Sequence, residues 1–288
     1  MRRSVDQILS KPAFPGMIGD GFRVYNVIPG YGVTQERVSP FLMMDYNPAH
    51  DFGPSDVARG VAPHPHKGFE AVTIAYKGSL AHSDSAGNEG IIRAGDVQWM
   101  TAGSGVLHKE YHEAHFSQRG GALEIVQLWV NLPRRFKYVP PAYKIFANKD
   151  FGSVKLDNGG VINVIAGDFA GTVGPARTFT PLNIFDIKLD AGGFASVPIP
   201  ANHNCVLFVI SGTAVVNDVP VAEHSLLLFK NDGTHVDIAV SVPAVLLLLS
   251  GAPIPEPIVS YGPFVMNSDE EIRQAIVDFQ AGKFGKLQ

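Results

Sequence analysis

The sequence predicts an all-β protein built from two similar antiparallel units. Apolar runs of about four to eight residues are cut by turn signals at close intervals, which is typical of sandwiches and barrels. Glycine (30 residues) and proline (21 residues) together exceed the roughly 12% share usual in soluble proteins, so turns are frequent. Aligning Gly212 with Gly78 superposes two strand–glycine–strand segments, which indicates an internal duplication.

Three strands are expected in the first half, because each run is rich in β-branched or aromatic residues and ends at a turn. They cover residues 72–76, 97–100 and 123–130. Residues 131–150 follow, and their three prolines interrupt both sheets and helices. We therefore place an interdomain connection there and divide the chain into domains 1–140 and 141–288.

The second half has the same pattern of short apolar runs separated by turns, and it ends in a helix. Strands are expected over residues 183–189, 205–210, 225–229 and 244–249. Near the end, Ser268 and Glu271 form a capping box, which marks a helix start. Apolar residues with helical spacing follow: Ile272, Ala275, Ile276 and Phe279. Gly282 is expected to end this helix, which packs against a sheet.

Composition excludes several classes of protein. The formal net charge is −4 and basic residues form no stripe, so we expect no direct nucleic-acid binding. Cys205 is the single cysteine, which rules out an intrachain disulfide or a cysteine-based zinc site. The first residues lack an apolar signal region, and the longest apolar run, 242–249, is too short to span a membrane. We expect a soluble, cytoplasmic monomer.

Two tripeptides contain the candidate metal ligands: His64-Pro65-His66 and His108-Lys109-Glu110. Residues i and i+2 of a strand point to the same face, so each tripeptide offers two ligands on one side. If both strands line one barrel interior, three imidazoles and one carboxylate converge. This donor set suits a divalent first-row metal with open positions for water, O2 or substrate.

The surroundings of these tripeptides resemble the two cupin motifs, and the whole chain resembles the pirin family. The matching stretches run from residue 64 to residue 285, with FLMMDYNP upstream; they are HPHKGFEAVT, HSDSAGNEG, AGDVQWMTAGSGVLHKE, QLWVNLP and YGPFVMNSDEEIRQAIVDFQAGKFG. The resemblance implies a bicupin: two stacked antiparallel β-barrels of jelly-roll type with a short C-terminal helix. It also implies one mononuclear metal in the N-terminal barrel, with the ligands His64, His66, His108 and Glu110.

Small departures from the family pattern leave these ligands intact. Lys67 stands where arginine is usual, Ala71 where threonine is usual, and Lys109 where serine is common. In the second half, the alignment of Gly212 with Gly78 places Pro198 and Pro200 at the positions of His64 and His66. Proline cannot bind a metal, so we expect no metal in the C-terminal barrel.

Other polar residues near the tripeptides receive structural interpretations. Glu70 is expected to be structural, and His82 to lie solvated or in a turn near the barrel mouth. His112 and His115 are expected in a surface loop. Gln127 and Trp129 are expected in the barrel wall, where Gln127 could face the pocket. Candidates for an apolar pocket wall are Phe41, Met43, Phe69, Trp99 and Met100.

The family resemblance implies a flavonol (quercetin) 2,4-dioxygenase, which opens the ring with O2 and releases carbon monoxide. The substrate would chelate the metal through its 3-oxygen and 4-carbonyl oxygen, and Glu110 would act as general base. Fe(II) is the favoured ion, with Ni, Cu, Co and Mn left open. Two alternatives remain: a metal- or redox-dependent binding protein that modulates transcription or a metabolic enzyme through a protein partner, or a non-catalytic bicupin.

Overall fold

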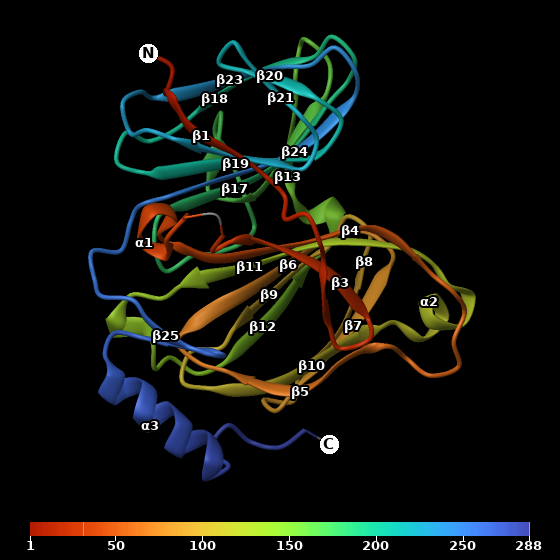
Figure 1. The fold of residues 1–288 in the computed structure, drawn as a ribbon, viewed down its shortest axis with the longest axis vertical. Helices are drawn as coiled ribbons and strands as arrows, with labels where there is room; N and C mark the ends of the chain where they lie inside the picture. Colours follow the sequence, from red (N-terminus) through yellow and green to blue (C-terminus); the bar gives the residue numbers. More distant parts are fainter. Residues whose placement is uncertain (31, 288) are drawn as a thin grey trace. The chain divides into compact units, whose positions relative to one another are not determined.

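Antiparallel strands make up most of the chain in the computed structural model, which describes residues 1–30 and 32–287 (Figure 1). Internal contacts distinguish two compact units, and each contains one seven-stranded and one four-stranded sheet. Within each unit, buried aliphatic and aromatic side chains from both sheets form the core. The predicted all-β class with two jelly-roll barrels is therefore confirmed.

The first barrel carries the two tripeptides. Its large sheet has the order β12-β9-β6-β11-β4-β3-β2, and its small sheet has the order β5-β10-β7-β8. The strands are β2 (Gly16–Ile18), β3 (Phe22–Ile28), β4 (Phe41–Phe52), β5 (Gly60–His66), β6 (Phe69–Lys77), β7 (Ser79–Asp84), β8 (Glu89–Arg93), β9 (Val97–Thr101), β10 (Val106–His112), β11 (Gly121–Asn131) and β12 (Ala142–Phe146).

The second barrel repeats this order strand for strand, as β1-β22-β19-β24-β17-β14-β13 and β18-β23-β20-β21. Gly78 and Gly212 follow the corresponding strands β6 and β19, and both have a φ of 81°, which glycine adopts at little cost. This shared order confirms the internal duplication. The strands are β1 (Val5–Ser10), β13 (Gly152–Lys155), β14 (Val161–Ala166), β17 (Leu182–Leu189), β18 (Phe194–Pro198), β19 (Asn204–Ser211), β20 (Ala214–Val216), β21 (Val219–Val221), β22 (Ser225–Phe229), β23 (His235–Ala239) and β24 (Ala244–Gly251).

Helices and small ribbons complete the described chain. The helices are α1 (Gln35–Val38), α2 (Ala114–Arg119) and α3 (Asp269–Gln280), with 3-10 turns η1 (Arg134–Phe136) and η2 (Asn148–Asp150). The ribbons pair β15 (Asp168–Phe169) with β16 (Thr172–Val173), and β25 (Val259–Tyr261) with β26 (Phe264–Met266). Among the described helices, none has both the length and the apolar character that a membrane crossing requires.

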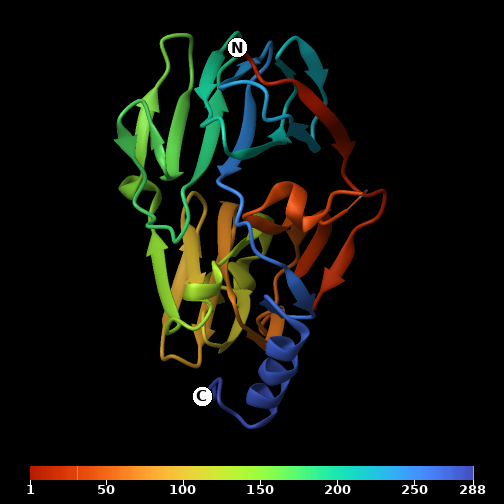
Figure 2. The same cartoon turned by 90° about the vertical axis from the view of Figure 1, so that its left-hand side faces the viewer.

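The predicted C-terminal helix is confirmed as α3, drawn in blue in Figures 1 and 2. Its N-cap forms as expected, because the Ser268 hydroxyl accepts a hydrogen bond from the Glu271 backbone N–H (3.3 Å). Ile272 and Ala275 are buried in a cluster with residues of β26.

The contact units interleave along the chain. Residues Met1–Lys11 belong to the unit of the second barrel, because β1 pairs with β22 at the edge of its large sheet. Residues from Ile254 onward belong to the unit of the first barrel, where the backbone of β26 bonds to the residue that follows β5. The sequence suggested contiguous halves instead. The assignment of cupin domains to residues 1–140 and 141–288 stays a prediction.

Candidate metal centre

The two tripeptides lie side by side in the first barrel. β5 and β10 are antiparallel neighbours, and His64 lies directly opposite His108 in their pairing. The register shifts by one residue between His108 and Glu110, and on its other edge β10 places Glu110 opposite His82 of β7. The i, i+2 alternation of each strand therefore directs both tripeptides toward a common cluster.

The imidazole rings of this cluster are closely packed. Ring centroids lie 4.3 Å apart for His64 and His108, 4.7 Å for His66 and His108, and 4.8 Å for His64 and His66. One ligand atom from each of these three residues lies within 4.8 Å of the others, and the same holds for His82, His108 and Glu110. His108 joins the two groups, which places a carboxylate next to the histidines.

Burial keeps His66 and His108 neutral. It holds the pKa of His108 well below the ordinary value, with further lowering by His66 and His64, and it lowers the pKa of His66 to about 3. Both ring nitrogens of His108 are buried without a hydrogen-bond partner among the described residues. His64 Nδ1 lies 2.9 Å from the Ala62 carbonyl oxygen, so Nδ1 donates this hydrogen bond and Nε2 is the ring nitrogen left to face a metal. Neutral imidazole is the form that binds metals, so these residues fit a divalent cation.

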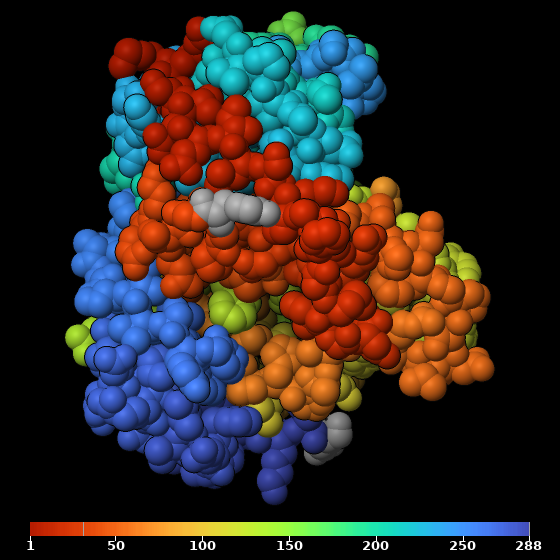
Figure 3. Space-filling model, in the orientation of Figure 1, coloured from red at the N-terminus to blue at the C-terminus, as the bar shows by residue number. Residues whose placement is uncertain are grey.

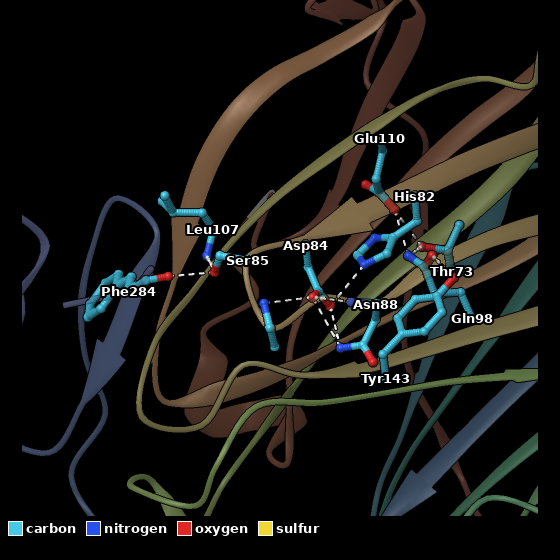
Figure 4. A network of polar contacts seen from close by, with 11 residues as sticks. Thr73, His82, Asp84, Ser85, Asn88, Gln98, Leu107, Glu110, Tyr143 and Phe284 are labelled. Atoms are coloured by element: carbon cyan, nitrogen blue, oxygen red, sulfur yellow. Dashed lines mark hydrogen bonds and ion pairs between the residues drawn. The ribbon is translucent and has the colours of Figure 1, made fainter. Parts of the chain in front are cut away.

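Glu110 is oriented by hydrogen bonds from three strands, and Figure 4 shows the partners Thr73 of β6 and Gln98 of β9. Its Oε1 accepts from Gln98 Nε2 (2.7 Å) and from Thr73 Oγ1 (3.4 Å), and its Oε2 accepts from Gln127 Nε2 (3.3 Å). The Tyr143 hydroxyl donates to Gln98 Oε1 (3.1 Å), which fixes the orientation of that amide. These contacts hold the carboxylate beside the imidazoles in one position.

A cavity of about 350 Å³ opens onto His64, His66 and Glu110. In Figure 3 the cavity is visible as a hollow in the molecular surface, between segments coloured red, orange and blue. Apolar side chains form much of the wall; they are Ile18, Phe22, Val24, Met43, Val61 and Trp129. A more open hollow of about 620 Å³ on the second barrel is lined by small apolar and hydroxyl residues without a metal ligand. Metal ligands and an apolar cavity therefore coincide in the first barrel.

Glu70 is separated from this site by the alternation of β6. Thr73 faces Glu110, so Glu70, an odd number of residues away, lies on the other face of the strand. Its Oε1 accepts from Trp99 Nε1 (2.9 Å) and Thr101 Oγ1 (2.8 Å), and burial raises its pKa to about 7. The structural role expected for Glu70 agrees with these contacts.

Two histidine interpretations were wrong. His82 was expected to be solvated, but it is buried, stacks on Tyr143 with ring centroids 4.2 Å apart, and lies 3.3 Å from Asp84 Oδ2. His112 was expected in a surface loop, but β10 extends through it and its Nε2 lies 2.9 Å from the Gly21 carbonyl oxygen. Both errors have one cause. These histidines are buried because they lie within β7 and β10, and the local sequence does not show where those strands end. His115 is exposed, as expected, but it lies on helix α2 rather than in a loop.

The expected cavity wall is correct in part. Met43, Gln127 and Trp129 line the cavity. Phe69 instead stacks on Trp129 with ring centroids 4.2 Å apart, and Met100 packs in the same core cluster. The remaining candidates, Phe41 and Trp99, are also buried but do not line the cavity.

Two polar cavity residues, Asp45 and Asn47, were missed. Both lie on β4 in the stretch FLMMDYNP, and both are almost fully buried. Two polar residues at positions i and i+2, directly after the apolar run at residues 41–44, were the available signal, because such residues share one face.

The second barrel has no comparable cluster in the part of the chain that the structure describes. Pro198 ends β18 opposite His235, and His203 Nδ1 lies 3.4 Å from Ser250 Oγ. Both groups of possible metal ligands found among the described residues lie in the first barrel. A single metal per chain stays a prediction.

Comparisons with known proteins agree with this architecture. The family model Pirin matches residues 21–130, and the model of the Pirin C-terminal cupin domain matches residues 184–285. A "Pirin-like protein" of Solanum lycopersicum is 38% identical over 87% of this chain and 83% of its own length. The chain belongs to the pirin family. The resemblance stated from the sequence is therefore confirmed.

Other relatives of this pirin carry the name of an enzyme. A protein of Pseudomonas aeruginosa named "Putative quercetin 2,3-dioxygenase" is 46% identical over 93% of both chains. The crystal structure of a quercetin 2,3-dioxygenase from Acinetobacter baumannii matches this pirin with a TM-score of 0.95 and 41% identity over the full length of both chains.

Proposed function

We propose that this pirin is a metal-dependent flavonol dioxygenase that cleaves quercetin-like substrates in the 2,4-mode, consuming O2 and releasing carbon monoxide. One observation carries the proposal: a cluster of histidines and a carboxylate opens onto an apolar cavity of about 350 Å³. Trp129 and Phe22 in its wall suit flat aromatic rings. The names of the relatives support the same substrate class.

The residues that would hold the metal are His64, His66, His108 and Glu110. His64, His66 and Glu110 line the cavity, and both ring nitrogens of His108 are buried without a hydrogen-bond partner among the described residues. His82 instead borders a separate hollow and contacts Asp84. The donor set of three nitrogens and one oxygen accepts Fe(II), which we favour, and also Ni, Cu, Co or Mn. A divalent ion at this site supplies Lewis-acid polarisation of the 3-hydroxyl and 4-carbonyl oxygens of a flavonol.

The protein's own groups would then move the proton and exclude water. Glu110 Oε1 is held by the short bond from Gln98, whereas Oε2 accepts one long bond from Gln127. Oε2 is therefore the oxygen available to take the proton of the 3-hydroxyl group as general base. The apolar wall keeps competing water away from the electron-rich ring as it reacts with O2.

Elemental analysis and a turnover assay test this function together. Purified protein should contain one transition-metal ion per chain, and with quercetin and O2 it should bleach the flavonol absorbance while releasing carbon monoxide. His64→Ala should lose both metal and turnover, whereas His115→Ala, which removes an exposed histidine on α2, should keep both. Metal-loaded protein that leaves quercetin and O2 unchanged would overturn the proposal and favour the binding or regulatory role instead.

A further inference from the structure

The wall of the cavity holds two acceptor side chains that the reaction does not use. Asp45 and Asn47 lie on β4 and line the cavity together with Met43, as the i, i+2 alternation of a strand dictates. Only 5% of Asp45 and 4% of Asn47 is exposed. Between them, Tyr46 points to the opposite face of the strand and donates its hydroxyl to Glu124 Oε1 (2.8 Å).

Both side chains have unused capacity to accept hydrogen bonds. Asn47 Oδ1 is buried and has no hydrogen-bond partner among the described residues. Asp45 accepts one hydrogen bond at Oδ1, from Asn26 Nδ2 (2.8 Å), and none of the described contacts engages its Oδ2. A buried acceptor without a donor lowers the stability of the fold, so native proteins seldom keep one without a use.

The charge of Asp45 strengthens this argument. Burial raises its pKa to about 6, with a smaller opposing effect of the Asn26 hydrogen bond, so the carboxylate is held at a cost to the fold. No cation is paired with it among the described ion pairs. A costly carboxylate in a ligand-sized cavity is typical of a functional position.

The position of the pair separates it from the metal cluster. Asp45 lies opposite Gln127 in the pairing of β4 with β11, and Gln127 donates to Glu110. Gln127 therefore stands between the acceptor pair and the carboxylate of the metal cluster. A flat ligand that engages Glu110 would extend its distal ring along the wall beyond Gln127, toward Asp45 and Asn47.

We infer that Asp45 and Asn47 form a hydroxyl-recognition site, which selects aromatic ligands whose distal ring carries hydroxyl donors. This inference rests on the proposed function, because it takes the ligand to be a flavonol. The pair would accept hydrogen bonds from phenolic O–H groups, so it would favour quercetin, which is hydroxylated on its outer rings, over 3-hydroxyflavone, which is not.

Anaerobic binding tests the inference separately from catalysis. Quenching of tryptophan fluorescence gives the Kd of each flavonol for the metal-loaded protein without O2, since Trp129 lies in the cavity wall. Asn47→Leu and Asp45→Leu should each weaken quercetin binding about tenfold to a hundredfold, and leave 3-hydroxyflavone binding within about threefold of the wild type. Asp45→Asn, which keeps an acceptor for Asn26, should show a smaller loss in the same direction and guards against misfolding of Asp45→Leu.

Tyr46→Phe is the matched control, because it removes a buried hydrogen bond from the same strand on the opposite face. It should leave the preference for quercetin unchanged. Equal losses for both flavonols, or no loss in either, would overturn the inference even if quercetin is turned over. Selective loss of quercetin binding in a protein that releases no carbon monoxide would instead uphold the site and reject the dioxygenase.

Discussion

Asp45 and Gln127 lie directly opposite each other on β4 and β11, and Gln127 Nε2 donates to Glu110 Oε2 at 3.3 Å. The same cross-strand row continues in both directions. Asn26 of β3 lies opposite Asp45, Thr73 of β6 opposite Gln127, and Gln98 of β9 opposite Thr73. A continuous polar row thus crosses five strands of an otherwise apolar barrel, and three of its members hydrogen-bond Glu110.

Gln98 is expected to control metal affinity, although it is not a ligand. It donates the shortest bond to Glu110 (2.7 Å) and is fully buried, so Gln98→Leu would release the carboxylate from its fixed orientation. Removing such a supporting partner typically weakens metal binding about tenfold to a hundredfold. Competition with a chromophoric chelator measures the change. Gln118→Leu, an exposed glutamine on α2, is the control, and equal affinities for the two variants would contradict the prediction.

The sequence predicted the meeting of the tripeptides because strand alternation is local. His64 and His66 share a face by their spacing alone, and so do His108 and Glu110. The repeat of strand–glycine–strand segments around Gly78 likewise predicted the duplicated order of the sheets.

The partners of Glu110 could not be predicted in the same way. Thr73, Gln98 and Gln127 lie far apart in the chain, and only the register of β6, β9 and β11 brings them into one row. Register depends on the packing of the whole barrel, not on the residues of one strand. The pairing of β1 with β22 also depends on contacts between residues far apart in the chain. The sequence therefore did not predict that the N-terminal segment joins the second barrel.

Lys137 is expected to be a major contributor to the stability of the first barrel. Its buried Nζ donates three hydrogen bonds of 2.8 Å, to the carbonyl oxygens of Gly68 and Val265 and to Asn131 Oδ1. Burial lowers the pKa of Lys137 to about 7, so the full set of three donors is present below that pH. Lys137→Met would leave these acceptors without a donor and should lower the free energy of unfolding by about 3 kcal/mol or more. Urea denaturation measures the loss. Lys144→Met removes an exposed lysine nearby and should change stability little, so similar effects of both variants would refute the prediction.

The Asp45 carboxylate is expected to lower the free energy of unfolding at neutral pH. This is consistent with a role in binding rather than in stability. The pKa of Asp45 rises from 3.8 in the unfolded reference to about 6 in the folded protein, chiefly because burial penalises the charged form. The folded state therefore binds this proton more tightly than the unfolded chain, and its stability falls as the pH rises from about 4 to about 6. The loss persists at higher pH and amounts to at most about 3 kcal/mol.

Asp45→Asn removes the charge but keeps an acceptor for Asn26, so the variant should be more stable than the wild type at pH 8. The difference should shrink as the pH falls and vanish below about pH 4, where the wild-type carboxyl is protonated in both states. Urea unfolding at pH 8, 6 and 4 measures this trend. Asp51→Asn, which neutralises an exposed carboxylate on the same strand, controls for the change in net charge. If Asp45→Asn were less stable than the wild type at pH 8, the prediction would be wrong. The hydrogen bond from Asn26 would then stabilise the Asp45 carboxylate by more than burial destabilises it.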